Sequence, residues 1–299
     1  SVLEHIEECG IHSGDSACCW PPFSLSEKIV DQIRAITKKL ALACGIRGLL
    51  NIQYAVRDEH VFVIELNPRA SRTVPFSSKA TGVSLAKYAS RIMAGEKISE
   101  LRAQGLLPDE NRTVDYYAVK EAVMPWSRFP GADSILGPEM KSTGEVMGIA
   151  RTFPAAYAKT REAVENKLPE QGSVFISVCD RDKRAIAPVA MALENLGYGI
   201  YTTGGTAKTL RAAGIDCTTV NRISDGHPNV VDLMRDKTVS FIINTPHGHE
   251  AHSDGTKMRA EAVSQGITCV TAMSAATALI QALAAARKSE PETFALQDL

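Results

Sequence analysis

The sequence has no long apolar run, almost no net charge and no paired-cysteine motif, and each absence narrows the class of protein. No apolar segment in the 299 residues approaches the roughly 20 residues that span a bilayer, so no membrane partner is expected. Lys plus Arg (33) nearly cancels Asp plus Glu (34), which argues against a nucleic-acid partner. The first residues, Ser1 to His5, include neither an initiator Met nor a signal-peptide pattern.

The cysteines give no sign of a disulfide framework. There are seven of them, an odd number, and none are spaced as C-x-x-C. Cys18 and Cys19 are adjacent, and adjacent cysteines seldom bridge, so a reactive pair is only the weaker alternative. The pattern indicates reduced thiols in a cytoplasmic protein, without cysteine catalysis.

Length and composition suit a globular protein of two domains, with a hydrophobic fraction of 44%. The polar segment 167–172 is predicted to link a domain at 1–166 to a domain at 167–299. After it, apolar runs alternate with helical segments, at 174–178, 186–196, 200–203, 207–213, 217–220, 230–234, 239–244, 258–263, 269–272 and 276–286. That rhythm predicts an α/β domain whose parallel sheet is covered by helices.

Several segments of the first domain are expected to be scaffold. Residues 24–27 match a capping box and precede apolar residues at helical spacing, up to the stop signal at Gly45. Helices are also predicted at 84–95 and 152–164, and a strand at 117–125. Taken alone, residues 1–23 indicate a polar loop.

Two alternating runs, 50–56 and 61–67, flank a short polar turn. Such a pair predicts an antiparallel hairpin in which Gln53 lies opposite Glu65 and Asn51 opposite Asn67. Because side chains alternate between faces, these four polar groups share one face. The other face is expected to carry the packed side chains Ile52, Tyr54, Phe62, Ile64 and Leu66.

The polar face of this hairpin suits a hard cation. Mg²⁺ takes a few protein oxygens and completes its shell with water and substrate phosphates, and here the Glu65 carboxylate is flanked by amides. Arg69 and Arg72 would then meet phosphate oxygens that the metal does not neutralise. A solvated sheet face with ordinary charges is the alternative that spacing alone leaves open.

The same residues carry a family resemblance. Gln53 followed by Glu65-Leu-Asn-Pro-Arg69 resembles the metal-binding end of an ATP-grasp domain. The longer run from Glu65 to Gly82 resembles the large subunit of carbamoyl phosphate synthetase, and the similarity extends over nearly the whole chain. The resemblance implies an incomplete ATP-grasp part, with a mixed or antiparallel sheet and helices, followed by a methylglyoxal-synthase-like parallel α/β allosteric domain.

For the first domain, the resemblance implies ATP-dependent phosphorylation of carbamate to carbamoyl phosphate, which serves pyrimidine and arginine biosynthesis. Two Mg²⁺ or Mn²⁺ ions would be held by Gln53, Glu65 and Asn67. Arg69 and Arg72 would be the catalytic residues that neutralise the transferred phosphoryl group. The ATP contacts would come from Gly10, Ile11, His12, Ser13, Gln53 and Glu65.

Two smaller sites are also implied by the resemblance. A pocket for the activator ornithine matches Glu7, Asp15, Glu121 and Thr271. A K⁺ site of the family lies near His5, the Ile11 carbonyl and Ser16. Cys269 stands where the ornithine pocket of the family has a tyrosine, which counts against ornithine activation.

The segment 202–206, Thr-Thr-Gly-Gly-Thr, ends the second strand of the predicted parallel sheet. Ligands of such sheets bind at the carboxyl ends of the strands, and free N–H groups at a helix start attract anions. With Lys183 nearby, a phosphate is predicted, and a tight turn with cap residues is the alternative. The resemblance implies a UMP- or IMP-like effector at Lys183, Thr203, Thr206, Arg222 and Asn244, although Arg222 replaces a lysine and Pro246 a threonine of the bacterial pattern.

Part of a complete ATP-grasp site has no counterpart before Glu65. Residues 1–64 contain no glycine-rich phosphate loop, so we expect the chain to begin partway through that domain and to be inactive alone. The resemblance implies that the remainder of the large subunit supplies the missing wall. A glutaminase small subunit is the second implied protein partner.

Other functions stay open at this point. The chain could be a non-catalytic regulatory module in which only 170–299 bind a nucleotide. Methylglyoxal synthase activity is weaker, because the loop that should hold an aspartate base reads Pro-His-Gly-His-Glu at 246–250. Zinc binding by His247, His249 and His252 is a weaker alternative to an effector-facing loop.

Overall fold

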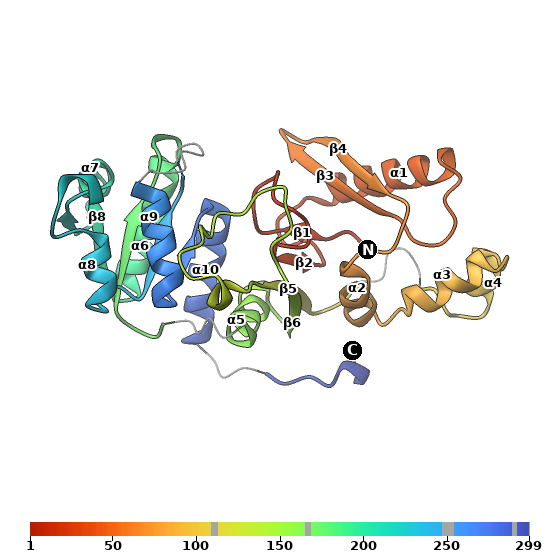
Figure 1. Ribbon diagram of the computed structural model, residues 1–299. Helices are drawn as coiled ribbons and strands as arrows, with labels where there is room; N and C mark the ends of the chain where they lie inside the picture. The colour runs from red at the N-terminus through yellow and green to blue at the C-terminus, as the bar shows by residue number, and fades with distance from the viewer. Residues whose placement is uncertain (109–112, 165–168, 247–253, 289–291, 299) are drawn as a thin grey trace.

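The computed structural model describes residues 1–108, 113–164, 169–246, 254–288 and 292–298. These residues form a four-stranded antiparallel sheet, a separate two-stranded hairpin and a five-stranded parallel sheet, all flanked by helices (Figure 1). The predicted fold class, an antiparallel part followed by a parallel α/β domain, is confirmed. Among the described helices, none is long and apolar enough to cross a membrane.

The antiparallel sheet has the order β1-β2-β5-β6. Its strands are β1 (Glu4–His5), β2 (Cys18–Trp20), β5 (Tyr117–Val123) and β6 (Gly144–Ala150). The strand predicted at 117–125 is confirmed, whereas the prediction of a loop throughout 1–23 is wrong at β1 and β2. Strand β2 pairs with β5, about a hundred residues away, and β1 then pairs with β2, so a local pattern does not reveal either strand.

Helix α5 (Phe153–Ala163) lies against this sheet, as predicted for 152–164, and Thr152 caps it by accepting a hydrogen bond from the Ala155 N–H at 3.4 Å. Gly148 of β6 permits the close approach, because a Cβ there would lie 2.3 Å from the Ala156 carbonyl oxygen.

The other helices of the first domain are α1 (Glu27–Ala43), α2 (Thr73–Thr81), α3 (Leu85–Met93) and α4 (Ile98–Ala103). The helix predicted at 84–95 is confirmed. The capping residue of α1 is Ser26 and not Ser24, because the backbone N–H and hydroxyl of Ser24 are bonded to the Glu4 carboxylate.

The hairpin consists of β3 (Asn51–Arg57) and β4 (His60–Asn67), joined at Asp58 and Glu59, whose φ angles of 50° and 60° form the tight turn. Asn51 pairs with Asn67 and Gln53 with Glu65, as predicted.

A bulge after Gln53 then shifts the register of the hairpin, so that Tyr54 faces Val63 and Ala55 faces Phe62. The expectation that Phe62 and Ile64 pack in a core is wrong, since they are 51% and 53% exposed. The physical reason is the extra residue in β4, which breaks the alternation of faces.

The second domain has a parallel sheet of order β11-β10-β7-β8-β9. The strands are β7 (Ser173–Ser177), β8 (Gly199–Thr203), β9 (Thr218–Val220), β10 (Phe241–Asn244) and β11 (Thr268–Val270). Helices α6 (Lys183–Asn195), α7 (Gly204–Ala212) and α10 (Met273–Ala286) pack on one face. Helices α8 (Val230–Arg235) and α9 (Asp254–Gln265) pack on the other. Short 3-10 turns occur at Trp126–Arg128, Asp180–Asp182, Ile223–Asp225 and Leu296–Asp298.

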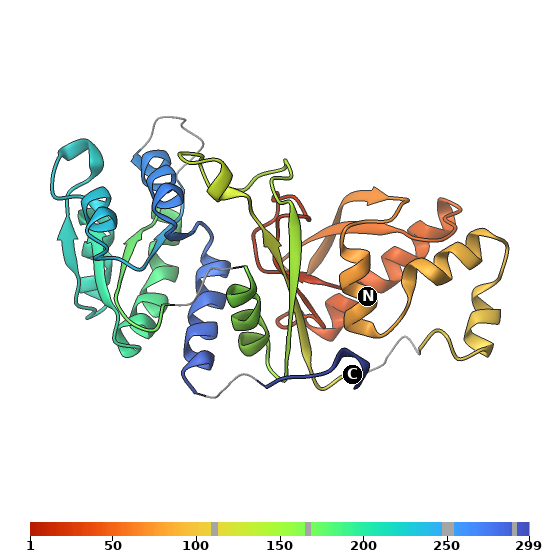
Figure 2. The ribbon, with the colours of Figure 1, turned by 60° about the horizontal axis from the view of Figure 1, so that its bottom comes forward.

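Helix α10 is shared by the two halves of the molecule. Its residues Leu279 and Leu283 belong to the core of the parallel sheet, whereas Ala278 and Ala282 pack with Phe153 and other residues of the first domain. Figure 2 shows α10 in blue beside α5 in green. The predicted domain border falls between residues 166 and 167, which lie outside the described residues, so the border stays a prediction.

Candidate functional site

The polar face of the hairpin brings the predicted metal ligands together. Asn67 Nδ2 donates to Glu65 Oε1 at 3.0 Å, and Gln53 stands opposite Glu65 in the register. Gln53 Nε2 also reaches the Ile11 carbonyl at 3.5 Å, which places the N-terminal loop beside the hairpin. The Glu65 side chain is exposed, so its carboxylate is accessible. Carboxylate and amide oxygens in one place are the donor set that a hard divalent cation prefers.

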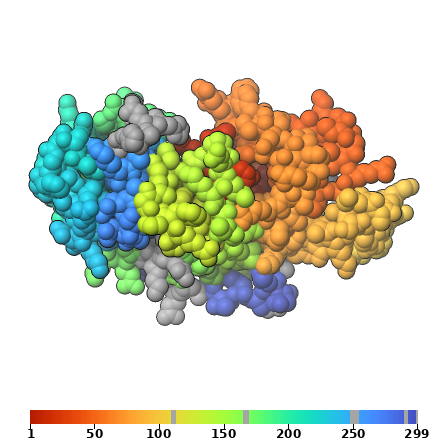
Figure 3. Space-filling view, viewed as in Figure 1, coloured from red at the N-terminus to blue at the C-terminus, as the bar shows by residue number. Residues whose placement is uncertain are grey.

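The N-terminal loop, residues 10–16, is held in shape by His12. The His12 carbonyl accepts hydrogen bonds from the N–H groups of Asp15 at 2.9 Å and Ser16 at 3.1 Å, and His12 Nδ1 accepts from the Gly14 N–H at 3.0 Å. Gly10 opens the loop with φ of 102°, a conformation that favours glycine. In Figure 3 the N-terminal segment, in red, lies in a hollow between the hairpin in orange and the segment before β6 in yellow-green.

The two predicted catalytic arginines are placed differently. Arg69 is exposed, and its Nη1 bonds only to the neighbouring Ala70 carbonyl at 3.0 Å among the contacts of the described chain. Arg72 is partly buried, and its Nη1 donates to both the carbonyl and the hydroxyl of Ser142, each at 3.1 Å. Ser142 belongs to the β5–β6 loop, residues 124–143, in which the sequence pattern indicates no functional residue. Arg72 is therefore the arginine whose position is set by tertiary contacts.

The acidic residues matched to the ornithine pocket separate into two groups. Asp15 is 2% exposed, and its carboxylate accepts the N–H groups of Lys141 at 2.7 Å and Ser142 at 2.9 Å. Glu121 is buried beside the Arg161 guanidinium at 3.3 Å. The Asp15 carboxylate is thus already bonded by the β5–β6 loop, and Glu121 has an internal cation. Thr271 follows β11 and is partly buried.

Glu7 lies close to Glu121 and accepts the Ala17 N–H at 2.6 Å. Burial, and then the charge of Glu121, raise the pKa of Glu7 to about 8. Burial likewise raises the pKa of Glu121, against the opposing effect of Arg161. Nearby, burial and then Lys120 lower the pKa of His5 to about 4, so its imidazole is neutral at pH 7. The first domain therefore contains a cluster of buried titratable groups, Glu7, Glu121 and His5, whose pKa values are shifted by burial and by neighbouring charged groups.

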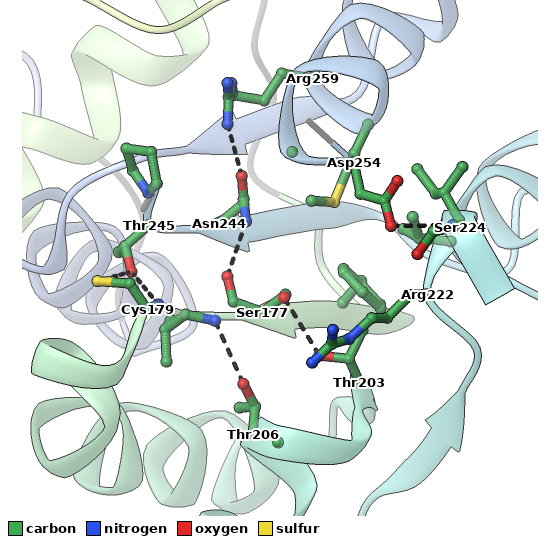
Figure 4. Close-up of a pocket in the computed structure, with 18 of the residues that line it drawn as sticks. Ser177, Cys179, Thr203, Thr206, Arg222, Ser224, Asn244, Thr245, Asp254 and Arg259 are labelled. Atoms are coloured by element: carbon green, nitrogen blue, oxygen red, sulfur yellow. Dashed lines mark hydrogen bonds between the residues drawn. The ribbon is translucent and has the colours of Figure 1, made fainter. Parts of the chain in front are cut away.

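A second site lies at the carboxyl ends of the parallel strands, where a cavity of about 520 Å³ opens (Figure 4). The loops after β7, β8, β9 and β10 converge there because all four strands point the same way. Every residue predicted to hold the effector lines this cavity: Lys183, Thr203, Thr206, Arg222 and Asn244.

The cavity has the features of an anion site. Lys183 lies near the start of α7, since a Cβ added to Gly205 would lie 3.5 Å from Lys183 Nζ, and its ammonium pairs with the Asp180 carboxylate. Thr206 Oγ1 accepts the Val178 N–H at 3.4 Å, and Thr203 Oγ1 lies 3.4 Å from Ser177 Oγ. A helix N-terminus with a lysine near it and hydroxyls around it suits a phosphate.

The structure adds pocket residues that the sequence pattern does not indicate. Arg259 of α9 lines the cavity and donates to Asn244 Oδ1 at 2.9 Å, and Asp254 accepts the Ser224 N–H at 3.0 Å. No local signal marks them, because they come from a helix and only the fold brings them to the strand ends. His247, His249 and His252 lie outside the described residues. The described part of the chain holds no group of three or more His, Cys, Asp or Glu arranged for a metal ion, and all seven cysteines are free thiols.

Comparison with known families matches both halves of the chain. Residues 3–101 match the model described as carbamoyl-phosphate synthase L chain, ATP binding domain. Residues 185–271 match the model described as MGS-like domain. Among solved structures, the biotin carboxylase domain of a thermophilic 2-oxoglutarate carboxylase covers 53% of this chain and 41% of its own. The TM-score is 0.40 and the identity 18%, too low to establish a common fold.

Individual relatives resemble the chain over nearly its whole length. The carbamoyl phosphate synthase large chain of Acidobacterium capsulatum is 46% identical over 297 residues, which are 99% of this chain and 27% of the relative. The large chain of Pseudomonas syringae pv. tomato is 47% identical over 302 residues, with coverages of 100% and 27%. The carbamoyl phosphate synthase large chain, C-terminal section, of Aquifex aeolicus is 45% identical over 306 residues, with coverages of 98% and 56%.

The chain thus spans about a quarter of the full-length relatives and about half of the C-terminal section. The resemblance inferred from the run at Glu65 is confirmed by the two domain matches and by these relatives. The chain belongs to the carbamoyl phosphate synthase large chain family and corresponds to the C-terminal part of that chain.

Proposed function

We propose that this chain forms one wall of an ATP site that phosphorylates carbamate, together with a regulatory domain that binds a nucleotide effector. The observation that carries the first half is the hairpin face, where Glu65 lies between two amides and next to the loop at Ile11. Phosphoryl transfer needs little covalent chemistry from the protein, because positioning and charge neutralisation supply most of the catalysis. The hairpin face and Arg72 provide those two functions.

Gln53, Glu65 and Asn67 would hold Mg²⁺ or Mn²⁺, which when bound neutralises charge on the ATP phosphates. Arg72 would meet the transferred phosphoryl group, and its two bonds to Ser142 keep the guanidinium oriented. The N-terminal loop 10–13 would contact the nucleoside of ATP. A K⁺ ion is proposed near His5, the Ile11 carbonyl and Ser16 on the resemblance alone.

We propose that the remainder of the large chain covers exposed apolar side chains of the hairpin. Val56, Phe62, Val63 and Ile64 are 39–53% exposed, and a two-stranded hairpin is marginally stable by itself. That partner would also supply the glycine-rich loop that residues 1–64 lack. The glutaminase small subunit is proposed as the second partner. A cytoplasmic location is supported by the seven free thiols.

Replacing Glu65 by glutamine is expected to lower ATP-dependent carbamoyl phosphate synthesis about 10²- to 10³-fold, because the carboxylate charge that holds the metal is lost. The assay uses the complete large chain, with ammonia as nitrogen donor. Glu59→Gln is the matched control, since Glu59 is an exposed carboxylate at the tip of the same hairpin, paired only with Lys28 in the described structure. Near-normal synthesis by Glu65→Gln would contradict the proposal that Glu65 binds the metal.

The second half of the proposal is an effector site in the parallel domain, for a UMP- or IMP-like nucleotide. The cavity of about 520 Å³ falls in the range of small-molecule sites, and Lys183 near the α7 N-terminus suits the phosphate. Ornithine has weaker support, because Asp15 is bonded by backbone N–H groups and Glu121 by Arg161. A purely regulatory module would share this cavity, and the Glu65→Gln assay distinguishes it from the enzyme.

Replacing Lys183 by alanine is expected to weaken UMP binding to the 299-residue chain about 10- to 150-fold, the cost of one hydrogen bond to a charged group. Isothermal titration calorimetry measures it directly. Lys208→Ala, which removes an exposed lysine from α7, should bind UMP as the unchanged chain does. Equal affinities for Lys183→Ala and the unchanged chain would contradict the assignment, and so would the absence of heat with every purine and pyrimidine nucleotide tried.

A further inference from the structure

Arg259 connects the effector cavity to the first domain. It is 3% exposed, and its Nη1 donates to Asn244 Oδ1 at 2.9 Å (Figure 4). Two further donors bind Asp133 in the β5–β6 loop, with Nε to Oδ1 at 2.5 Å and Nη2 to Oδ2 at 2.8 Å, and Nη2 also donates to Thr256 Oγ1 at 3.3 Å. A fork of two parallel bonds fixes the orientation of both groups, so the two halves of the molecule are joined by a defined geometry at this point.

Asn244 is held from both ends. Its Nδ2 donates to the Ser177 carbonyl at 2.9 Å, while its Oδ1 accepts from Arg259. Both Asn244 and Ser177 line the cavity. A ligand that contacts the Asn244 amide would therefore touch a group bonded to the Arg259 guanidinium, which in turn holds the Asp133 carboxylate.

The β5–β6 loop carries the connection onward to the ATP side. The Gly137 carbonyl accepts the His12 N–H at 2.8 Å. Four residues later, the Lys141 and Ser142 N–H groups bind the Asp15 carboxylate, and Ser142 holds Arg72. One loop thus bonds to the effector cavity at Asp133 and to the N-terminal loop and the phosphate-binding arginine within the next nine residues.

The ion pair is charged under ordinary conditions. Burial by itself would raise the pKa of Asp133, but hydrogen bonds from Arg259 and from the Ile135 N–H lower it below its usual value. Asp133 also accepts that Ile135 N–H at 3.0 Å, so its position is tied to the local turn of the loop. A shift of the carboxylate is consequently passed to the loop backbone.

We propose that the Asp133–Arg259 ion pair couples effector binding in the cavity to the placement of His12 and Arg72, through the β5–β6 loop. The proposal rests on the nucleotide-effector function and assigns the residues that carry its signal. Asp133 is a positioning residue, because it contacts the cavity only through Arg259. Coupling between two sites in proteins is typically worth about 5- to 150-fold. A forked pair whose guanidinium is buried and whose carboxylate is partly buried is a suitable carrier of an effect of that size.

Hydrogen–deuterium exchange on the full 299-residue chain tests this, with saturating UMP as the probe. In the unchanged chain, UMP should slow exchange in peptides covering 202–208, 134–143 and 10–16. In Asp133→Ala, protection of 202–208 should remain and protection of 10–16 should be lost. Without ligand, the Lys141 and Ser142 amides should exchange about fivefold or more faster in this variant.

Two further variants serve as a control and as a conservative replacement in this experiment. Glu139→Ala removes an exposed carboxylate from the same loop, one with no hydrogen bond or ion pair to the described residues, and should match the unchanged chain. Asp133→Asn retains the shape and one acceptor, and should show an intermediate loss.

Undiminished UMP protection of 10–16 in Asp133→Ala would overturn the proposal. If UMP protects nothing in the unchanged chain, the effector function fails instead. In that case the exchange rates of the Lys141 and Ser142 amides without ligand still test the ion pair. Equal rates in Asp133→Ala and Glu139→Ala would show that the Asp133–Arg259 pair does not position the β5–β6 loop.

Discussion

Replacing Arg161 by alanine is expected to lower the free energy of unfolding by about 3–5 kcal/mol, the usual cost of removing one partner from a buried ion pair. Arg161 and Glu121 each have side chains only 11% exposed, and their charged atoms lie 3.3 Å apart. Without the guanidinium, the Glu121 carboxylate would stay buried near Glu7 with no cation at that side. Urea denaturation of the 299-residue chain at pH 7 measures the loss.

The control for this experiment is Arg57→Ala. Arg57 also forms an ion pair, with Asp58, but both side chains are 85% exposed. Exposed pairs contribute about 0–1 kcal/mol, so this variant should unfold at nearly the same urea concentration as the unchanged chain. If Arg161→Ala proved as mild as Arg57→Ala, the buried cluster would not depend on its internal cation.

The second large effect is a dependence of stability on pH that comes from Glu7. Its pKa is raised from 4.5 to about 8 by burial and by Glu121, so the folded chain keeps a proton that the unfolded chain has released. Stability from this group is therefore present at low pH and is lost as the pH rises toward 8. The loss should reach about 1.4 kcal/mol per pH unit.

The titration of His5 changes the stability with pH in the opposite direction, so its contribution must be distinguished from that of Glu7. Its pKa is lowered to about 4 from 6.5, so its contribution to stability grows as the pH rises between those values and is flat above them. Above about pH 6.5 His5 no longer contributes, but burial also lowers the pKa of the Ser1 amino group from 8.0, which opposes the Glu7 slope up to about pH 8. The Glu7 effect is therefore measured between about pH 6.5 and 8 as the difference in slope between the unchanged chain and Glu7→Gln. In that range Glu7→Gln should make the slope less negative by about 1.4 kcal/mol per pH unit, whereas Glu8→Gln at the exposed neighbour should leave the slope unchanged. An unchanged slope in Glu7→Gln would show that Glu7 does not carry the proton.

The local sequence pattern was sufficient to predict the elements that are formed by residues close together in the chain. The hairpin and the pairing of Gln53 with Glu65 followed from two alternating runs and a polar turn. The parallel domain followed from regular alternation of apolar runs and helices. The effector cavity was predictable because parallel strands place their carboxyl ends at one edge, so residues such as Lys183 and Asn244 had to converge.

Features that depend on distant partners were not predictable. Strand β2 forms because it pairs with the distant β5, and β1 forms by pairing with β2. The bulge at Ile64 exposes side chains that strict alternation would bury. Arg259 looked like an ordinary helical arginine, and the loop residue Asp133 had no distinguishing neighbour. Their bidentate contact spans 126 positions of the chain and became visible only in the folded structure.

Because helix α10 packs in the cores of both halves, the boundary between the halves in space does not coincide with the predicted domain border in the sequence. Ala278 and Ala282 complete the core under α5, and Leu279 and Leu283 complete the core of the parallel sheet. A cut between residues 164 and 169 would sever one covalent connection and leave this helix in both cores. In the excised C-terminal piece, the alanine-lined face of α10 that packs against α5 would be exposed to water. The two pieces would each keep half of a shared interface, which is the requirement for fragment complementation.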